Sequence, residues 1–582
     1  MSDTSSTASA RDGAFSIRET LTGKHVLLTG ASGFVGKVWL AMMLQQLPQI
    51  GRIYVLLRGK GRGARERFEK IVNESHVFKG LHEAHGERMS EFVSQRVEVI
   101  GGDVSQPHLG MDEQTEARLL RDVDVVINFA GLVDFNPDVR EAMASNVGGA
   151  LNVADFCERS DHGTLLHVST CYVAGHRDGR VGEVPVRERT PNGSVLSASA
   201  EYETLKQIIA GVIADNDDPA TEATLREDVL RRLAERGHEG SDAKRVTDMV
   251  TRLKRKRLRE NMANAGTDRA KVLGWPNTYT YTKALAEALL EERGDKLRFA
   301  VLRPAIVESA TEFPFAGWNE GFNTSGPLVY LAGTWFRHVP AAAGNPLDII
   351  PVDFVCKAIT IVACALIRGE ATRIYQCGSS DRNFLAIDRL TELSALGHRQ
   401  HLRKHGGTAL DKLVLSRWDA KAADPEHVLN VTNIRKLMAQ VTRYLKHGRP
   451  EKIPSEVREW ADDMSKTTDN GVRKLRQIED VLELFMPFTY EHFCVFVCRA
   501  IDKHVIAEPE FRFAPETIEW RSYWLDVHMP GLRRWCFPEY EDKPKEIYAP
   551  ATPFRLLDPP ATTNASVASS GKPSGSSVGE VG

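Results

Sequence analysis

The 582-residue chain lacks a long uninterrupted apolar run and has only eight cysteines. The longest apolar stretch, 354–367, covers about 14 residues and contains Lys357, whereas a bilayer-spanning helix needs about 20. It therefore predicts a buried helix and no transmembrane segment. Residues 1–14 lack the apolar core of a signal peptide, and Asp3 and Asp12 argue against a transit peptide. We expect a cytoplasmic protein with reduced thiols, and a peripheral membrane contact stays open.

The chain also lacks a strong charge of one sign. A net charge of −3 gives no global attraction to nucleic acid, so we expect no nucleic-acid partner. Cys494 and Cys498 lie one helical turn apart, but no second Cys/His pair follows at the spacing of a zinc site. Packing is the better interpretation of this pair, and we predict no metal site.

Short apolar segments alternate with helical patterns from residue 24 onward. This alternation is typical of βαβ units, in which helices cover both faces of a parallel sheet. The predicted strands share an apolar, β-branched character: His25–Thr29, Ile53–Leu57, Val97–Ile100, Val123–Ile127, Leu165–Ser169, Phe299–Leu302 and Asp348–Pro351. The fold class is therefore α/β, a Rossmann-type doubly wound parallel sheet.

The length exceeds the roughly 250–300 residues at which a single core stops growing, which predicts more than one domain. The expected parts are a Rossmann domain at 21–385 and a mainly helical C-terminal domain at 386–555. Residues 176–274 read as a charged helical insertion in the first domain. Residues 1–20 and 556–582 read as disordered tails, the second because of its Ser, Gly and Pro content.

The insertion ends in a basic run between Arg252 and Arg259. Acidic residues are interspersed in the helical stretches before it, and no aromatic side chains accompany it. A solvated helix face is the favoured interpretation. Nucleic-acid binding and contact with an anionic cofactor or membrane surface are the alternatives.

A glycine-rich loop directly follows the first predicted strand and opens the first helix. It reads Thr29-Gly30-Ala31-Ser32-Gly33-Phe34-Val35-Gly36. Glycines at this spacing permit a tight turn, close approach of backbone to pyrophosphate, and close helix packing. The free amides and the dipole of the helix start then bind the anion. The loop predicts a dinucleotide site.

The residue after the second strand decides which ribose fits. An acidic side chain there would accept from a free 2′-hydroxyl, but this chain has Arg58, followed by Lys60. Basic side chains suit the 2′-phosphate of NADP, so we expect NADPH as the cofactor. A merely solvated basic loop is the alternative.

Two further strand ends are expected to line the cofactor. Asp103, followed by Val104, comes after the third strand and could accept from the adenine amino group. Asn128, Ala130 and Gly131 close the fourth strand, where the backbone would face the cofactor.

A tyrosine and a lysine, Tyr279 and Lys283, stand four residues apart and therefore share one helix face. Tyr281 falls on another face, which selects Tyr279. An adjacent ammonium favours the ionised phenol, so we expect Lys283 to lower the pKa of Tyr279. The same lysine can donate to the nicotinamide ribose.

A hydroxyl at the end of the fifth strand completes the predicted catalytic group. Ligands bind at the carboxyl ends of parallel strands, where Ser169 and Thr170 lie. Counting back from Gly175 favours Thr170 as the donor to a substrate oxygen, with Ser169 as the alternative.

Together these motifs resemble the extended short-chain dehydrogenase/reductase superfamily. The segments that carry the resemblance are TGASGFVG, HVST, YTYTK and Arg303-Pro304-Ala305-Ile306-Val307. The resemblance implies that Pro304, Ile306 and Val307 lie beside the cofactor. Within the superfamily the chain is similar to fatty acyl-CoA reductases, through VLLRGK, PNTYTYTKALAE, IIPVDFV and the C-terminal WRSYW…HMPG. The long charged insertion fits bacterial members best.

This resemblance implies NADPH-dependent reduction of a long-chain fatty acyl-CoA to a fatty alcohol through an aldehyde. Tyr279, Thr170 and Lys283 would be catalytic, and Lys283 would also hold the cofactor. The alternatives are an acyl-CoA reductase that stops at the aldehyde, and an extended reductase acting on a sterol or nucleotide-sugar.

Overall fold

A seven-stranded, wholly parallel sheet forms the centre of the computed structural model, in the order β11-β7-β5-β4-β1-β2-β3. Its strands are β1 Val26–Thr29, β2 Ile53–Leu57, β3 Val97–Gly101, β4 Val125–Asn128, β5 Thr164–Val168, β7 Phe299–Pro304 and β11 Ile374–Cys377. The structure describes residues 14–59, 62–186, 189–235, 242–320, 325–333, 338–406, 419–424, 431–447, 486–491, 493–540 and 543–558, with positions 472, 476, 479 and 482. The strand order reverses between β1 and β4, and ligands bind at such switch points.

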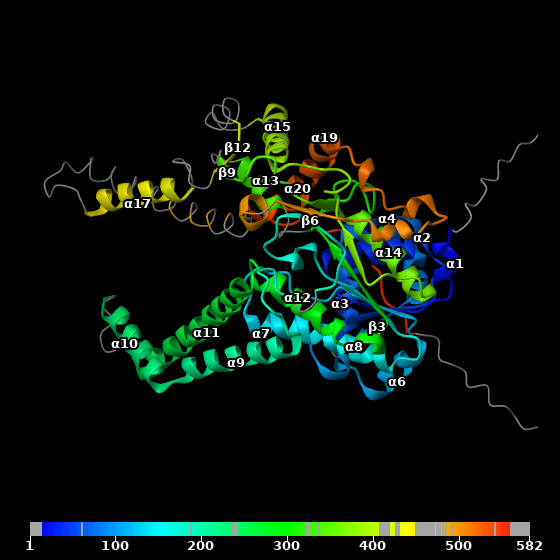
Figure 1. Ribbon diagram of the computed structural model, residues 1–582, viewed down its shortest axis with the longest axis horizontal. Coiled ribbons are helices and arrows are strands. Elements are labelled where there is room, and N and C mark those ends of the chain that lie inside the picture. Colours follow the sequence, from blue (N-terminus) through cyan, green and yellow to red (C-terminus); the bar gives the residue numbers. More distant parts are fainter. Residues whose placement is uncertain are drawn as a thin grey trace, which may run out of the picture.

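Helices cover both faces of this sheet, so most strand residues are buried on either side (Figure 1). Alternate residues of each strand therefore belong to two different apolar clusters. One face packs against α2 Phe34–Gln46, α3 Arg62–Glu74 and α14 Val352–Arg368. The other packs against α6 Glu113–Asp122, α8 Gly149–Arg159 and the end of α12 Thr278–Glu291. The predicted α/β fold class is confirmed, as is the buried helix expected at 354–367, which lies within α14.

The remaining elements surround this layered core. Short parallel pairs join β6 Gly179–Val181 to β13 Cys494–Phe496, β8 Ile306–Glu308 to β10 Ile349–Pro351, and β9 His338–Pro340 to β12 Lys421–Ala423. Of the helices around the core, α15 Ile387–His405 is long, and the short ones are α4 Lys79–His85, α5 Met89–Ser94, α7 Val139–Ala142, α13 Gly326–Ala332, α19 Trp520–Ser522, α20 Met529–Trp535 and α21 Phe537–Tyr540.

Described residues before and after 385 share one apolar core. Trp524 and Phe554 belong to the same buried cluster as Val355 of α14, and the Phe554 ring lies 5.9 Å from the Phe68 ring of α3. The C-terminal segment thus wraps back onto the sheet domain.

The two ends of the described chain are packed more firmly than the sequence predicts. The expected N-terminal tail, 1–20, is wrong for its last residues, because Ile17–Leu21 forms helix α1 and Ile17 is fully buried. The expected C-terminal tail also begins too early. Arg65 of α3 donates to the Leu556 carbonyl at 2.8 Å and to Asp558 at 2.6 Å.

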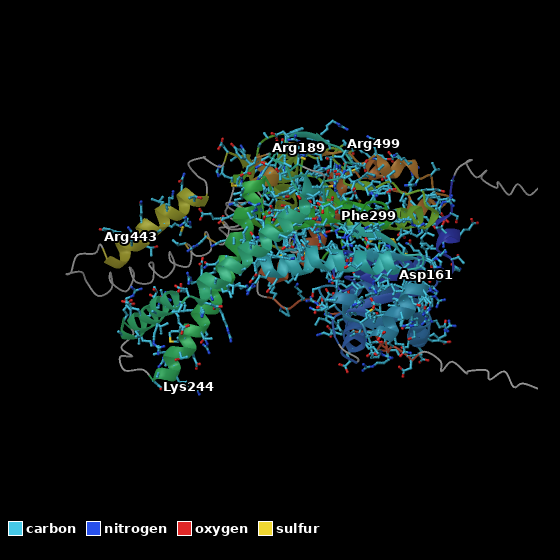
Figure 2. The ribbon with its side chains drawn as sticks, turned by 60° about the horizontal axis from the view of Figure 1, so that its bottom comes forward. Asp161, Arg189, Lys244, Phe299, Arg443 and Arg499 are labelled. Atoms are coloured by element: carbon cyan, nitrogen blue, oxygen red, sulfur yellow. The ribbon has the colours of Figure 1, made fainter. Side chains whose placement is uncertain are left out.

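Two helical projections lie to one side of this body in both views (Figures 1 and 2). The insertion forms an arm of three helices, α9 Ala198–Asp217, α10 Pro219–Glu235 and α11 Ala243–Leu273. Its outer half packs on itself through Val229 and Val246, and its inner half packs against α12. The second projection is α17 Val431–His447. Across the described parts of the chain, no helix combines the length and apolarity needed to cross a membrane.

Candidate active site

The glycine loop connects β1 to α2 with its backbone pressed against neighbouring chain. Gly30 has a φ of +71°, and a Cβ atom there would lie 2.8 Å from the Ala130 nitrogen. A Cβ on Gly36 would lie 2.5 Å from the Gly30 carbonyl oxygen. Any side chain at these two positions would therefore force the loop away from β4 or from α2. Gly33 is the N-cap of α2 and makes no side-chain cap bond, which leaves first-turn amides for an anion.

A cleft of about 560 Å³ opens over this loop at the point where the strand order reverses. Its volume is in the range of a small-molecule or cofactor site. Nine of the residues that the sequence assigns to the cofactor line it: Thr29, Gly30, Ser32, Gly33, Arg58, Asp103, Val104, Ala130 and Gly131.

Basic side chains lie at the β2 end of the cleft. Arg58 follows β2 and is exposed, and Lys60 lies outside the described residues. Sequence reasoning missed Arg67, which also lines the cleft and places its guanidinium 3.5 Å from the Ser32 hydroxyl. Because α3 directly follows the loop after β2, a basic residue near its start could have been assigned to the same site as Arg58.

Polar side chains at the ends of β3 and β4 are already held by protein partners. Asp103 Oδ1 accepts from the backbone and hydroxyl of Ser105, at 2.9 and 2.8 Å. Its role toward adenine stays a prediction. Asn128 is buried behind the cleft, where its Oδ1 accepts from Thr29 Oγ1 at 2.6 Å and from the Ala130 amide at 3.2 Å. Asn128 thus joins β1 to β4 beneath the predicted cofactor.

The side chains in the first turn of α2, Phe34 and Val35, do not line the cleft. Phe34 lines a second cavity of about 350 Å³ that shares Ser32 with the cleft. The Val35 carbonyl lies 3.8 Å from the Cys356 thiol of α14. Their backbone amides, rather than their side chains, are what an anion over the loop would contact.

The predicted catalytic residues lie together at the carboxyl end of the sheet. Thr170 follows β5, is 5% exposed, and its hydroxyl lies close enough to the Tyr279 hydroxyl to lower the pKa of that phenol. Lys283 follows Tyr279 by one helical turn on α12 and donates from Nζ to the Val168 carbonyl at 2.7 Å. A Cβ on Gly131 would lie 3.7 Å from Lys283 Nζ, so this ammonium reaches the cleft lining. The alternative residue, Ser169, has a buried hydroxyl with no partner among the described residues.

The expected lowering of the Tyr279 pKa is wrong in this structure. Burial raises the pKa of Tyr279 to about 12, and the nearby Thr170 hydroxyl only partly opposes this. The Lys283 ammonium instead donates to Val168. Its own pKa is lowered by burial to about 8, opposed by the carboxylate of Glu287. Near neutral pH Tyr279 is a protonated donor and Lys283 is charged.

The two tyrosines of the YTYTK segment lie on different faces of α12, as their spacing predicts. The Tyr281 hydroxyl donates to Glu201 of α9 at 2.5 Å, and its ring packs 5.6 Å from Trp275. Tyr281 therefore anchors the insertion arm, and Tyr279 alone of the two contacts Thr170.

Residues after β7 lie close to this group. The Pro304 carbonyl is 3.4 Å from Thr170 Oγ1, and Ile306 and Val307 form β8 beside β10. Their contact with a cofactor stays a prediction. Arg303, one residue earlier, forms a buried ion pair with Glu287 of α12, with an Nε–Oε1 distance of 3.1 Å. This pair fixes α12 against β7.

Asn146 is a further buried polar residue that sequence reasoning missed. It lies in the π-helical turn Met143–Gly148 before α8, a type of turn that is frequent at functional sites. Its Oδ1 accepts from the Leu132 amide at 2.7 Å, and its Nδ2 donates to Thr282 Oγ1 at 3.0 Å. Asn146 thus ties the loop after β4 to the catalytic helix. A lone asparagine inside an apolar helical pattern was the available signal.

A parallel sheet that reverses its strand order over a glycine-loop cleft, in a chain that matches an NAD-binding family, indicates an oxidoreductase that uses a nicotinamide dinucleotide. Its class is the extended short-chain dehydrogenase/reductases. Residues 28–359 match the model of an NAD-binding family described as "Male sterility protein", and the chain belongs to that family.

Similar proteins extend along most of the chain. It is 27% identical over 538 residues to fatty acyl-CoA reductase 8 of Arabidopsis thaliana, covering 89% of this chain and 98% of that protein. It is 27% identical to the alcohol-forming fatty acyl-CoA reductase of Simmondsia chinensis, again over 89% of this chain and 98% of the relative. A solved terminal R domain from the myxalamid biosynthetic pathway covers 90% of this chain and 93% of its own, with 15% identity and a TM-score of 0.49.

Proposed function

We propose that this protein reduces long-chain fatty acyl-CoA thioesters to fatty alcohols with NADPH, through an aldehyde intermediate. The observation that carries the proposal is the grouping of Thr170, Tyr279 and Lys283 beside the glycine-loop cleft. It occurs in a chain whose relatives, aligned along almost their whole length, are named as fatty acyl-CoA reductases, one of them alcohol-forming. The substrate class comes from those relatives and the chemistry from the residues.

The cleft suits a dinucleotide, because Gly30, Gly33 and Gly131 in its lining carry no side chain and leave the backbone open to a ligand. Gly33 and the first turn of α2 would hold the pyrophosphate, and Lys283 would donate to the nicotinamide ribose. Arg58 and Arg67 favour a 2′-phosphate over a free hydroxyl, since both line the β2 end of the cleft. When bound, the cofactor supplies a hydride to the carbonyl carbon.

Thr170 and Tyr279 act on the carbonyl oxygen of the substrate. Both hydroxyls can donate to the oxyanion that develops as the carbonyl is reduced, and their burial strengthens such bonds. A tyrosine with a pKa near 12 stays protonated at neutral pH and therefore acts as donor rather than base. Collapse of the reduced thioester releases the CoA thiol and leaves an aldehyde.

The second reduction repeats this arrangement on the aldehyde. Here Tyr279 transfers its proton to the alkoxide oxygen, which yields the alcohol. Lys283, with a pKa of about 8, carries the positive charge that stabilises the phenolate left behind. Asn146 and Glu287 hold α12 in place while the proton moves.

Product analysis with purified protein, palmitoyl-CoA and NADPH tests the proposal. We expect two NADPH oxidised for each CoA released, with hexadecanol as the product. One NADPH per CoA with accumulating hexadecanal would instead assign a reductase that stops at the aldehyde. No NADPH oxidation with any fatty acyl-CoA would refute the proposed substrate class.

A further inference from the structure

Helix α17, Val431–His447, has an unusual composition that the proposed reaction does not use. Its sequence contains no Asp or Glu, although the chain as a whole carries 78 acidic and 75 basic residues. It carries four cationic side chains: Arg435, Lys436, Arg443 and Lys446. The helix is therefore a local positive segment in a nearly neutral protein.

One side of α17 packs against the protein. Arg435 donates to Glu479 at 2.6 Å, Thr432 donates to the same carboxylate at 2.5 Å, and Thr442 is 5% exposed. These three positions hold the helix in place and fix which of its faces points outward.

The outward side carries an apolar stripe. Leu437, Val441 and Tyr444 are 62%, 43% and 63% exposed. Their i, i+4 and i+7 spacing puts them within about 60° of one another around the helix axis. Lys436 and Arg443, both exposed, lie about 80–100° further round one side of the helix, with the exposed Gln440 between them and the stripe. The exposed surface of α17 thus combines a narrow apolar strip with a cationic strip further round the helix.

Both figures place α17 to one side of the sheet domain, and Figure 2 shows Arg443 on it well apart from Phe299 of β7. A helix of 17 residues is about 25 Å long, which suits a helix lying along a surface and is too short and too charged to span a bilayer.

Chemistry favours lipid over a protein partner for this stripe. Three apolar side chains supply far less than the roughly 800 Å² that each partner contributes to a standard protein interface. The two outward cations, Lys436 and Arg443, with no acidic residue on the same helix, would also repel a second copy of it. An apolar strip accompanied by Lys and Arg, with a tyrosine among its members, is typical of helices that lie in the headgroup region of a membrane.

We infer that α17 binds the surface of an anionic lipid bilayer. Leu437, Val441 and Tyr444 enter the boundary between headgroups and acyl chains, and Lys436 and Arg443 face the lipid phosphates. This inference goes beyond the proposed reaction and does not depend on it, because binding to lipid requires neither substrate nor cofactor.

Vesicle co-sedimentation with the full chain tests it directly. The protein should bind vesicles of phosphatidylcholine mixed with phosphatidylglycerol, bind pure phosphatidylcholine vesicles more weakly, and be released by high salt. The triple variant L437D/V441D/Y444D should lower the partition coefficient by about tenfold or more. Leu230→Asp is the matched control, since Leu230 is 51% exposed on α10 and should leave binding unchanged.

A second variant guards against misfolding of the first. K436E/R443E keeps the apolar stripe and should abolish the preference for phosphatidylglycerol, with an unchanged melting temperature. Absence of wild-type binding to anionic vesicles would overturn the inference. Equal vesicle binding by the triple variant and the wild type would also overturn it. If the triple variant became monomeric by light scattering where the wild type is a dimer, and still bound vesicles, the stripe would instead be a contact between two copies of the chain.

Discussion

Two parts of the predicted active site, the cleft lining at the end of β2 and the residue group at the end of β5, differ in how they hold charge. At the β5 end, Thr170 and Lys283 are 5% and 4% exposed; Lys283 donates to the Val168 carbonyl, and Thr170 lies beside the partly buried Tyr279. At the β2 end, Arg58 is exposed and Arg67 makes only a long contact with Ser32. Burial shifts the pKa values of Tyr279 and Lys283, whereas solvent surrounds Arg58.

This difference separates chemistry from binding. A buried hydroxyl pair is pre-oriented and poorly hydrated, so it can stabilise a charge that exists only in the transition state. Exposed guanidinium groups lower the free energy of the bound ground state and of the transition state by the same amount. They therefore affect binding of the cofactor and not the rate of the chemical step. Substitutions at the β5 end should therefore change kcat, and substitutions at the β2 end should change the KM for the cofactor.

Removing the Tyr279 hydroxyl should give the largest effect. We expect Tyr279→Phe to lower kcat by about 10³-fold or more, because it removes both an oxyanion donor and the proton donor. Binding of NADPH, measured by fluorescence titration, should change by less than about threefold. Lost cofactor binding would contradict a role confined to chemistry.

Tyr281→Phe is the matched control on the same helix. It removes a hydroxyl bonded to Glu201 rather than to Thr170. We expect kcat to stay within about threefold, while the free energy of unfolding falls by about 1–3 kcal/mol because a buried carboxylate loses a donor. Equal losses of kcat in the two variants would break the distinction between the faces of α12.

Thr170→Val should give the next largest effect. The isosteric change removes the hydroxyl that is proposed to donate to the substrate oxygen, and we expect kcat to fall by about 10²-fold. Thr170→Ser keeps the hydroxyl and should recover most of the rate. Ser169→Ala should be nearly silent; a larger loss at Ser169 than at Thr170 would reverse their assigned roles.

The sequence identifies which residues lie at the end of β5, but it does not predict their pKa values. Strand ends, the glycine loop and the i, i+4 spacing depend on local periodicity, and the structure has them where the sequence places them. The pKa of Tyr279 depends instead on how deeply its hydroxyl is buried and on where the Lys283 ammonium points. Both are set by tertiary packing, which spacing along one helix does not report.

Contacts between distant segments were likewise beyond the sequence pattern. Asn146 acts through Leu132 and Thr282, and Arg67 through the loop after β1. Residues 15–20 looked like part of a polar tail, yet Phe15 and Ile17 join the main core, and Glu508 accepts from the Ile17 amide at 3.0 Å. Such anchors have no local signal.

A pH profile should show how burial of Lys283 limits the reaction. Because its pKa is lowered to about 8, Lys283 is charged below pH 8 and loses its proton above it. We expect kcat/KM to be level below this pH and to fall about tenfold per pH unit above it. Arginine keeps its charge at high pH, so Lys283→Arg should shift the alkaline fall of kcat/KM to higher pH or remove it. A fall that stays at the same pH would assign the titration to another group.

At the β2 end the effects should be smaller and confined to one cofactor. Arg58→Ala and Arg67→Ala should each raise the KM for NADPH by about 10-fold, as expected for loss of one charged hydrogen bond. The KM for NADH and the kcat with either cofactor should stay within about twofold. Lys70→Ala, at an exposed site on α3 next to Glu74, is the control. Equal effects on NADPH and NADH would remove the argument for a 2′-phosphate site.

Charge reversal on the insertion arm should have the smallest effect on the reaction. It tests whether an exposed basic helix face contributes to substrate binding. Arg255 and Lys256 are exposed on α11, and Lys256 lies 3.6 Å from Glu260 on the same helix. A solvated ion pair contributes about 0–1 kcal/mol, so R255E/K256E should change the KM for acyl-CoA and the melting temperature very little. A rise of tenfold in that KM at low salt, absent at high salt, would instead identify this face as a contact for the CoA phosphates. The arm, like Arg58, would then be a surface that binds a ligand without taking part in the chemistry. The separation of binding residues from catalytic residues would hold for the acyl-CoA substrate as well as for the cofactor.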